Sequence, residues 1–375
     1  MKILFTGGGS GGHFYPIIAV AEKINEIARA QKILAPKLYF MSDSPYDQNL
    51  LNENQIEFVP NTAGKVRQYF SLLNIVDLFK TALGVFFALI KIFVIFPDVV
   101  FSKGAYNSFP VVLAARFFGI PIIIHESDSV PGRVNLWAGK FAQKVAISYP
   151  EAAQYFNKDK VALTGNPLRV GVEQTQTMDA RDFLKLKINK PLLLILGGSL
   201  GSQKINNVIL DCLPQLISKV QIIHQTGKNN IDEVTKLSNM ILDNNPDKDD
   251  YHPTEYLNSL NLTMAGSTAD LIISRAGSTI FEIANWGRPS IMIPITDSNG
   301  DHQRKNAYAY ARAGATVVIE ETNLASNVLL MEINRLISSP ESLAKMSQNA
   351  KAFSKPDASE MIASEILRIG ISHEE

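Results

Sequence analysis

Cysteine and net charge are what this sequence has least of. Its 375 residues include a single cysteine, Cys212, so the chain cannot form an internal disulfide and fits a reducing compartment. Its 36 basic and 36 acidic side chains give a formal net charge of zero. Because no overall positive field is present, we expect no nucleic-acid partner.

The N-terminal residues also lack the pattern of a secretory signal peptide. A strand-like run, KILFT at 2–6, begins at once, without a basic segment and an apolar segment before it. We therefore expect the protein to stay in the cytoplasm.

One apolar stretch, ALGVFFALIKIFVIF at 82–96, raises the question of a membrane. It is shorter than the roughly 20 residues that a spanning helix needs. It therefore predicts either a buried core helix or a helix lying in a membrane interface. Lys80 and Lys91 fall on nearly the same helical face, and Lys65 lies upstream, which suits an anionic lipid surface.

Short apolar strands alternate with amphipathic helices, and the pattern starts afresh at PLLLILGGS (191–199). This predicts an α/β protein with two doubly wound, Rossmann-like domains, each built on a parallel sheet. We expect the N-terminal domain to occupy 1–165 and the C-terminal domain 166–345. The remaining residues, 346–375, read as helices that pack back on the first domain.

The first glycine-rich loop, GGGSGG at 7–12, follows a strand and precedes a helix. Its spacing matches a dinucleotide fingerprint, and a helix N-terminus can hold an anion. Asp43, after the expected second strand, would then bind a ribose, so an NAD-dependent oxidoreductase remains an alternative. A tight strand-to-helix turn without a ligand is a further, less favoured explanation of the same glycines.

The second domain has three polar turns after strands: GGSLGS (197–202), SRAGSTIFE (274–282) and DHQRKNA (301–307). Backbone N–H groups at 198–202 suit a diphosphate without a metal, and Glu282 suits the two hydroxyls of a ribose. Each turn alone is explained by a helix cap. Together they favour a nucleotide-sugar site. The acidic stretch 243–250 is better explained as a solvated loop than as a metal site.

These motifs, in this order, resemble the MurG family of peptidoglycan glycosyltransferases. The resemblance covers nearly the whole chain and is carried by GGGSGGHFYP, HESDSVPGRVN, GNPLR, GGSLGS, HQTGK, RAGS–FE and DHQRKNA. It implies a two-domain GT-B fold with the ligand cleft between the domains. The first domain would bind the acceptor and the membrane, and the second would bind the UDP-sugar.

The resemblance also implies the reaction. N-acetylglucosamine would move from UDP-N-acetylglucosamine to the 4-hydroxyl of undecaprenyl-diphospho-N-acetylmuramoyl-pentapeptide, with inversion and without cofactor or metal. The protein would lie peripherally on the cytoplasmic face of the cell membrane, held to anionic lipid through residues 65–96. A glycosyltransferase with another lipid acceptor and a non-catalytic membrane-associated module are the remaining alternatives.

By the same resemblance, His13 is the expected catalytic base and Glu126 the runner-up. Asp128 stands where the family often has asparagine. The resemblance gives substrate-binding roles to residues from both domains: Ser10, Gly11, Gly12, Asp128, Arg169, Ser199, Leu257, Ser278, Thr279, Glu282 and Gln303.

Overall fold

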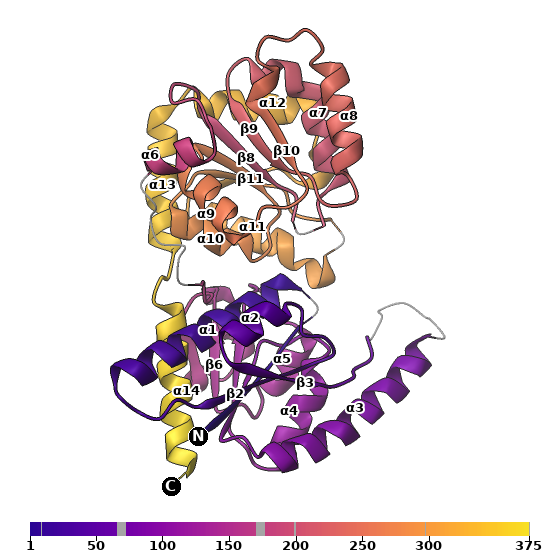
Figure 1. Cartoon of the computed structure of the whole chain (residues 1–375), viewed down its shortest axis with the longest axis vertical. Coiled ribbons are helices and arrows are strands. Elements are labelled where there is room, and N and C mark those ends of the chain that lie inside the picture. Colours follow the sequence, from indigo (N-terminus) through magenta and orange to yellow (C-terminus); the bar gives the residue numbers. More distant parts are fainter. Residues whose placement is uncertain (9, 66–72, 170–176, 199, 297, 375) are drawn as a thin grey trace. The chain divides into compact units, whose positions relative to one another are not determined.

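The chain forms two compact units, residues 1–171 with 355–375 and residues 172–354. The structure, a computed structural model, describes all residues except 9, 66–72, 170–176, 199, 297 and 375 (Figure 1). Each unit is described by itself below.

The first unit contains a seven-stranded sheet in the order β3-β2-β1-β4-β5-β6-β7, in which every pair of neighbours is parallel. The strands are β1 (Lys2–Thr6), β2 (Lys37–Ser42), β3 (Ile56–Pro60), β4 (Val99–Ser102), β5 (Ile122–Glu126), β6 (Lys144–Ile147) and β7 (Val161–Leu163). The helices are α1 (Gly11–Ala30), α2 (Gln48–Glu53), α3 (Leu73–Ile95), α4 (Ser108–Phe117), α5 (Arg133–Ala138) and α14 (Ala358–Glu374), with short 3-10 turns η1 (Pro150–Tyr155) and η2 (Lys158–Lys160).

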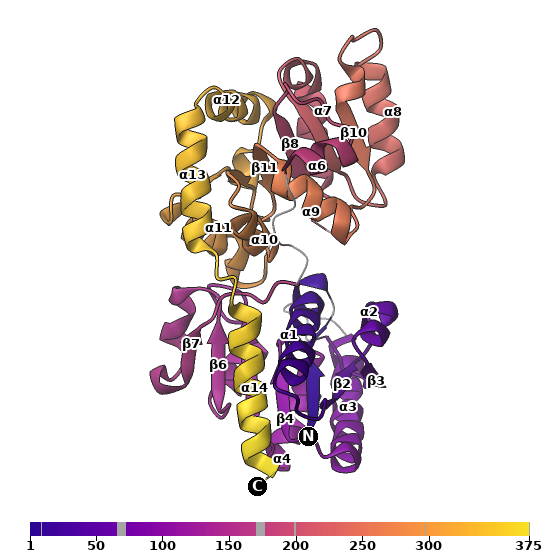
Figure 2. The same cartoon turned by 60° about the vertical axis from the view of Figure 1, so that its left-hand side comes forward.

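Both faces of this sheet are covered, which explains why its strands are continuous apolar runs rather than alternating ones. Ile3 and Phe5 of β1 pack with buried residues of α1 and α14, which lie side by side (Figure 2). Leu4, on the opposite face, packs with the cluster that includes Ala88 of α3 and Val111 of α4. The predicted parallel α/β sheet is confirmed.

The second unit contains a six-stranded parallel sheet in the order β10-β9-β8-β11-β12-β13. The strands are β8 (Leu192–Leu196), β9 (Gln221–Gln225), β10 (Tyr251–Thr254), β11 (Leu271–Ser274), β12 (Ser290–Met292) and β13 (Thr316–Val318). The helices are α6 (Thr177–Phe183), α7 (Gln203–Ile217), α8 (Ile231–Ile241), α9 (Ser259–Thr268), α10 (Thr279–Trp286), α11 (His302–Arg312), α12 (Ser326–Ile337) and α13 (Pro340–Phe353), with η3 (Lys248–Asp250), η4 (Asn299–Asp301) and η5 (Glu321–Asn323).

The core of the second unit again has two sides. Leu193 and Ile195 of β8 pack in a cluster with apolar residues of α7 and α12. Leu192 and Leu194 face the other way and pack with residues of α9 and α10. Since all strands are parallel, the turns after them meet at one edge of each sheet, where ligands bind in proteins of this class.

The division between the units differs from the expected one after residue 165. Arg169 lies 3.3 Å from Glu22 of α1, and Ser359 of α14 donates to the Leu168 carbonyl. These contacts place residues 166–169 in the first unit.

The expectation that all of 346–375 packs on the first unit is wrong for its first part. Residues up to Phe353 continue α13, and the Phe353 ring packs on Tyr310 of the second unit, with ring centroids 4.9 Å apart. Only the last helix, α14, belongs to the first unit.

The apolar stretch predicted at 82–96 belongs to a longer helix than the sequence indicated. α3 has 23 residues, and Ile75–Ile95 is long and apolar enough to cross a membrane by length and composition, with mean hydropathy 2.2. Only 17% of its most apolar window is buried. Of the two alternatives, the exposure disfavours a buried core helix, because most of the described apolar side chains of α3 are exposed.

Candidate active site

The glycine-rich loop of the first unit is packed closely against the neighbouring turns. A Cβ on Gly8 would lie 2.6 Å from Ser42 Oγ and 2.7 Å from Asn107 Nδ2. A Cβ on Gly7 would lie 2.9 Å from Lys103 Cβ. These glycines are therefore required by packing within the unit, whether or not a ligand approaches the loop.

Ser10 and His13 lie together where this loop enters α1. Ser10 is the N-cap residue, and its Oγ lies 3.0 Å from His13 Nδ1 instead of accepting from a backbone N–H. The His13 side chain is half-buried. If Nδ1–H donates to Ser10, the lone pair of a neutral imidazole is on Nε2, the form that a general base requires.

Glu126 is held by its own loop. The residue is 4% exposed; one carboxylate oxygen accepts from Asp128 N–H at 2.9 Å, and the other accepts from Gly132 N–H and Asn135 Nδ2, both at 3.0 Å. Burial, with a contribution from the charge of Asp128, raises the pKa of Glu126 to about 6. A carboxylate with three donors from its own chain is well suited to shape the turn at 127–132.

Lys103 is a buried cation beside this turn that the sequence analysis missed. It is 2% exposed, and its Nζ donates to His125 Nδ1 at 2.6 Å and to Asn166 Oδ1 at 3.4 Å. His125 Nε2 lies 2.9 Å from the Gly165 carbonyl. Burial lowers the pKa of Lys103 to about 8 and holds the pKa of His125 well below its usual value. The sequence feature that could have identified Lys103 is a lysine placed directly after an apolar strand.

Asp43, the residue that a dinucleotide site would use for the ribose, is bonded to the turn after β4. Its carboxylate accepts from the Tyr106 hydroxyl at 2.8 Å and from Asn107 Nδ2 at 2.7 Å. Burial and the bond to Asp43 raise the pKa of Tyr106 to about 12. Asp43 therefore holds the turn after β4, and each of its carboxylate oxygens accepts from a protein donor.

The glycine-rich loop of the second unit lies against the turn after β9. A Cβ on Gly201, whose φ is +77°, would lie 1.9 Å from the Thr226 carbonyl oxygen. A Cβ on Gly227 would lie 2.2 Å from the Leu200 carbonyl oxygen. Ser202 caps α7 and accepts from Ile205 N–H. Ser199, an expected diphosphate ligand, lies outside the described residues.

Arg275 contacts three turns at this edge of the sheet. It belongs to the SRAGS motif, but the sequence predicted no role for it. Its guanidinium donates to Ser202 Oγ at 2.6 Å, to Glu321 Oε1 at 2.5 Å and to the Ile293 carbonyl at 3.0 Å. These partners follow β8, β13 and β12. Arg275 therefore fixes the start of α7 relative to the neighbouring strand ends.

The start of α10 is open. Ser278 occupies the N-cap position without a side-chain cap bond, and Thr279 is the first helical residue. A Cβ on Gly277 would meet nothing within 4 Å. Glu282, in the first turn, is half-buried, and burial raises its pKa to about 7. Within the described part of the chain, no hydrogen bond or ion pair engages its carboxylate.

Two further polar side chains join the turns of this edge. Gln303, at the start of α11, accepts from Ile295 N–H at 3.1 Å through Oε1. Gln225, which the sequence analysis passed over within HQTGK, donates to the Gly198 carbonyl and accepts from Leu257 N–H, both at 3.0 Å. Leu257 is thereby placed next to the glycine-rich loop.

The expected site residues divide between the two units. The first unit contains Ser10, Gly11, Gly12, His13, Glu126, Asp128 and also Arg169; the second contains Leu257, Ser278, Thr279, Glu282 and Gln303. Arg169, expected with the second domain, pairs with Glu22 of α1. Among the residues described, no three His, Cys, Asp or Glu side chains are grouped as a metal site, and Asp247 of the acidic stretch pairs with Lys190 at 3.2 Å.

Two parallel α/β units, each with helix N-termini and glycine-rich turns at one edge of its sheet, define the two-domain GT-B class. Residues 3–147 match the N-terminal domain of glycosyltransferase family 28, and residues 192–362 match its C-terminal domain. The chain belongs to the MurG family within these glycosyltransferases.

Three known proteins illustrate the relationship. The UDP-N-acetylglucosamine--N-acetylmuramyl-(pentapeptide) pyrophosphoryl-undecaprenol N-acetylglucosamine transferase of Clostridium botulinum (strain 657 / Type Ba4) is 36% identical over 338 residues, 89% of this chain and 90% of that protein. The transferase of the same name from Clostridium novyi (strain NT) is 36% identical over 355 residues, 94% of each chain. The crystal structure of Acinetobacter baumannii MurG is similar with a TM-score of 0.73 and 25% identity, covering 98% of this chain and 99% of that one.

Proposed function

We infer that this protein transfers N-acetylglucosamine from UDP-N-acetylglucosamine to undecaprenyl-diphospho-N-acetylmuramoyl-pentapeptide, the step from lipid I to lipid II in peptidoglycan synthesis. The observation that carries the inference is 36% identity, over 94% of the chain, to a transferase named for this reaction. The two sheets, with their separate polar edges, support it, because the reaction needs one site for a nucleotide and one for a lipid-linked sugar.

The donor site in this proposal is the polar edge of the second unit. N–H groups of the loop 197–202 and the open start of α10 hold the diphosphate. Glu282 accepts from the ribose hydroxyls, and the backbone at Leu257 meets the uracil. Gln303, Ser278 and Thr279 complete the contacts. The carboxylate of Glu282, which has no protein partner among the described residues, supports this assignment.

The acceptor side and the base are assigned to the first unit. His13 Nε2 takes the proton from the acceptor 4-hydroxyl as its oxygen attacks the anomeric carbon. The bond from that carbon to the diphosphate breaks, and the electron pair leaves with UDP, stabilised by the loop N–H groups and by Arg169. Glu126 shapes the loop that carries Asp128. Ser10, Gly11 and Gly12 line the donor sugar.

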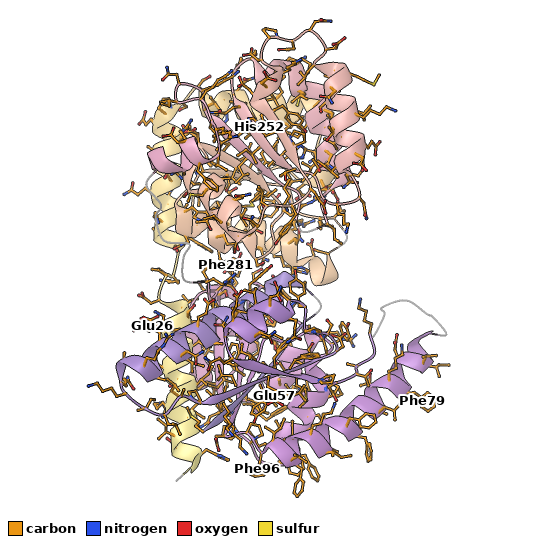
Figure 3. The ribbon with its side chains drawn as sticks, in the orientation of Figure 1. Glu26, Glu57, Phe79, Phe96, His252 and Phe281 are labelled. Atoms are coloured by element: carbon orange, nitrogen blue, oxygen red, sulfur yellow. The ribbon has the colours of Figure 1, made fainter. Side chains whose placement is uncertain are left out.

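Peripheral attachment to the cytoplasmic membrane face is proposed to occur through α3. Gly84, Ala88 and Ile92 form its buried line against the unit. The opposite side exposes apolar side chains, and Phe79 and Phe96 near its two ends are 68% and 47% exposed (Figure 3). A helix joined to its own domain along one face and apolar on the other suits an interface better than a span. Lys80 is also exposed on it.

The experiment that tests the function is UDP release by purified protein given UDP-N-acetylglucosamine and a soluble lipid I analogue, with EDTA present. Acceptor-dependent release, together with the disaccharide product in the mass spectrum, is the expected result. Folded protein that binds UDP-N-acetylglucosamine but releases no UDP would show that the acceptor is wrong and would favour another lipid-linked acceptor.

A further inference from the structure

Gln225 lies between the two segments to which the donor nucleotide is assigned. It is the last residue of β9 and is 6% exposed. In register it pairs with Leu196, the last residue of β8, on one side, and with Thr254, the last residue of β10, on the other. The glycine-rich loop follows the first of these strands, and the segment that reaches Leu257 follows the second.

The Gln225 amide is bonded to both segments. Its Nε2 donates to the Gly198 carbonyl at 3.0 Å, and its Oε1 accepts from Leu257 N–H at 3.0 Å. The amide is planar, and its donor and acceptor are fixed relative to each other. One buried side chain therefore sets the spacing between two turns that lie on opposite sides of it.

The bond to Gly198 matters for binding an anion. The Gly198 carbonyl also accepts from Gly201 N–H at 3.0 Å, so its oxygen is held by two protein donors. A diphosphate is bound by N–H groups and repelled by carbonyl oxygens. Holding this oxygen toward β9 leaves the loop to present N–H groups to the ligand.

The bond to Leu257 matters for recognition of the base. Its N–H is used by Gln225, and within the described part of the chain no donor contacts its carbonyl oxygen. Leu257 therefore has an acceptor to offer and not a donor. Uracil carries a donor at N3–H, whereas N3 of cytosine is an acceptor.

The backbone next to Gln225 strengthens the connection. Thr226 N–H donates to the Thr254 carbonyl at 2.9 Å, and Gly227 N–H donates to the Glu255 carbonyl at 3.2 Å. On its other side this turn meets Gly201 so closely that a Cβ there would be 1.9 Å from the Thr226 oxygen. A displacement of either segment is thus transmitted to the other.

We propose that Gln225 is a positioning residue that couples the diphosphate loop to the base-binding segment, so that one side chain determines both the grip on the diphosphate and the preference for uracil over cytosine. The proposal rests on the proposed UDP-sugar site and adds to it a residue that acts through Gly198 and Leu257 without touching the ligand.

Two substitutions test the hydrogen bonds from Gln225 to Gly198 and to Leu257 separately. In Gln225→Glu the carboxylate still accepts from Leu257 N–H but opposes the Gly198 carbonyl. In Gln225→Leu both bonds are lost, and Leu257 N–H becomes available to N3 of cytosine. Gln215→Glu, the same change at an exposed position of α7, is the matched control. Dissociation constants for UDP, UMP and CDP are measured by isothermal titration calorimetry, with melting temperatures recorded in parallel.

At pH 8 we expect Gln225→Glu to reduce the preference for UDP over UMP by about tenfold and to leave the preference for UDP over CDP unchanged. Gln225→Leu should reduce both preferences, the second by about fivefold. Lowering the pH should restore UDP binding by Gln225→Glu relative to wild type, because a protonated carboxyl again donates to Gly198. Gln215→Glu should match wild type throughout.

Wild-type protein that binds no UDP would overturn the donor site itself. Wild-type protein that binds UDP, with lowered melting temperatures but unchanged nucleotide preferences in both Gln225 variants, would overturn only the role of Gln225 and leave it as a buried stabilising residue. If Gln225→Leu does not fold, the Gln225→Glu preferences and their pH dependence decide the question.

Discussion

At the residue scale, buried polar groups that are bonded within the protein and polar groups without a bonded partner have different roles. Lys103, Glu126, Gln225 and Arg275 are enclosed and bonded to the turns around them. Glu282 is half-buried and has no bonded partner among the described residues. A buried group with satisfied bonds fixes geometry, whereas a desolvated carboxylate without partners is a candidate to receive a ligand.

Glu282 should give donor binding a pH dependence. Burial raises its pKa to about 7, so the carboxylate that accepts from ribose hydroxyls forms as the pH rises from 6 to 8. We expect UDP affinity to rise over that range by up to about tenfold. Calorimetric titration of UDP at pH 6, 7 and 8 measures it.

Glu282→Gln is the matched variant, because it keeps the shape and cannot ionise. The titration of UDP itself is common to both proteins, so the ratio of their affinities isolates Glu282. Identical pH profiles for the two proteins would remove Glu282 from the ribose site.

Lys103 should make stability depend on pH in the alkaline range. Burial lowers its pKa to about 8 from 10.5, so between those values the unfolded chain holds a proton that the folded chain has released. Stability contributed by this group therefore rises with pH, by up to roughly 3 kcal/mol. The free energy of unfolding of wild type and of Lys103→Met is measured by urea unfolding from pH 7.5 to 10. Equal slopes of this free energy against pH in the two proteins would contradict the lowered pKa of Lys103.

At the element scale, α3 is the feature whose sequence and surroundings disagree most. Its composition is apolar enough for a buried helix, yet Leu78, Phe79 and Phe93 are 70%, 68% and 67% exposed. Phe117 at the end of α4 is 75% exposed, and Phe118 beside it contacts Phe93. An exposed apolar surface of this extent indicates a binding partner, and a lipid surface fits its chemistry.

Replacing Phe86 and Phe87 together with serine should weaken binding to anionic vesicles by at least about tenfold. The two side chains are 57% and 44% exposed, so the folded state should lose little stability. Vesicle co-sedimentation measures binding, and thermal unfolding confirms folding.

The control for this pair is Met240→Ser with Met331→Ser in the second unit, where the side chains are 66% and 65% exposed. Vesicle binding should be unaffected there. Equal vesicle binding by the α3 variant and wild type would place the membrane contact elsewhere.

At the scale of the whole molecule, the chain crosses between its units twice. It leaves the first unit near residue 171 and returns near 355, and α14 completes the core that α1 begins. Ile362 and Ile366 of α14 are 2% and 0% exposed. The first unit therefore depends on residues synthesised last.

Ending the chain after Ser354 should unfold the first unit and leave the second folded. Several fully buried aliphatic side chains are lost, each contributing about 1.5–3 kcal/mol, which exceeds the margin of a typical domain. Calorimetry should then show one transition, still raised by UDP. Ending the chain after Ile371 removes only terminal residues and should leave wild-type behaviour. Two transitions in the chain that ends after Ser354 would refute the dependence of the first unit on α14.

Much of the fold was predictable because buried parallel strands and amphipathic helices have local signatures. KILFT and LLLIL are continuous apolar runs, and both became central strands, β1 and β8. The turns after strands were predictable for the same reason. The boundaries at 165 and 345 were not, because they depend on Arg169 meeting Glu22 and Phe353 meeting Tyr310, contacts between distant residues.

The sequence by itself determined the α/β class, the two-fold repeat of the architecture and the turns that carry the candidate site, since each of these is written in local pattern and motif order. Only the tertiary structure decided which polar groups are bonded to protein neighbours and which are open. Glu126 is bonded within its own loop, Asp43 is bonded to the turn after β4, and Lys103 and Gln225 are buried side chains that join separate segments. The structure also decided that most of the described apolar side chains of α3 are exposed. Burial and pairing are properties of neighbours, and neighbours here come from segments far apart in the chain.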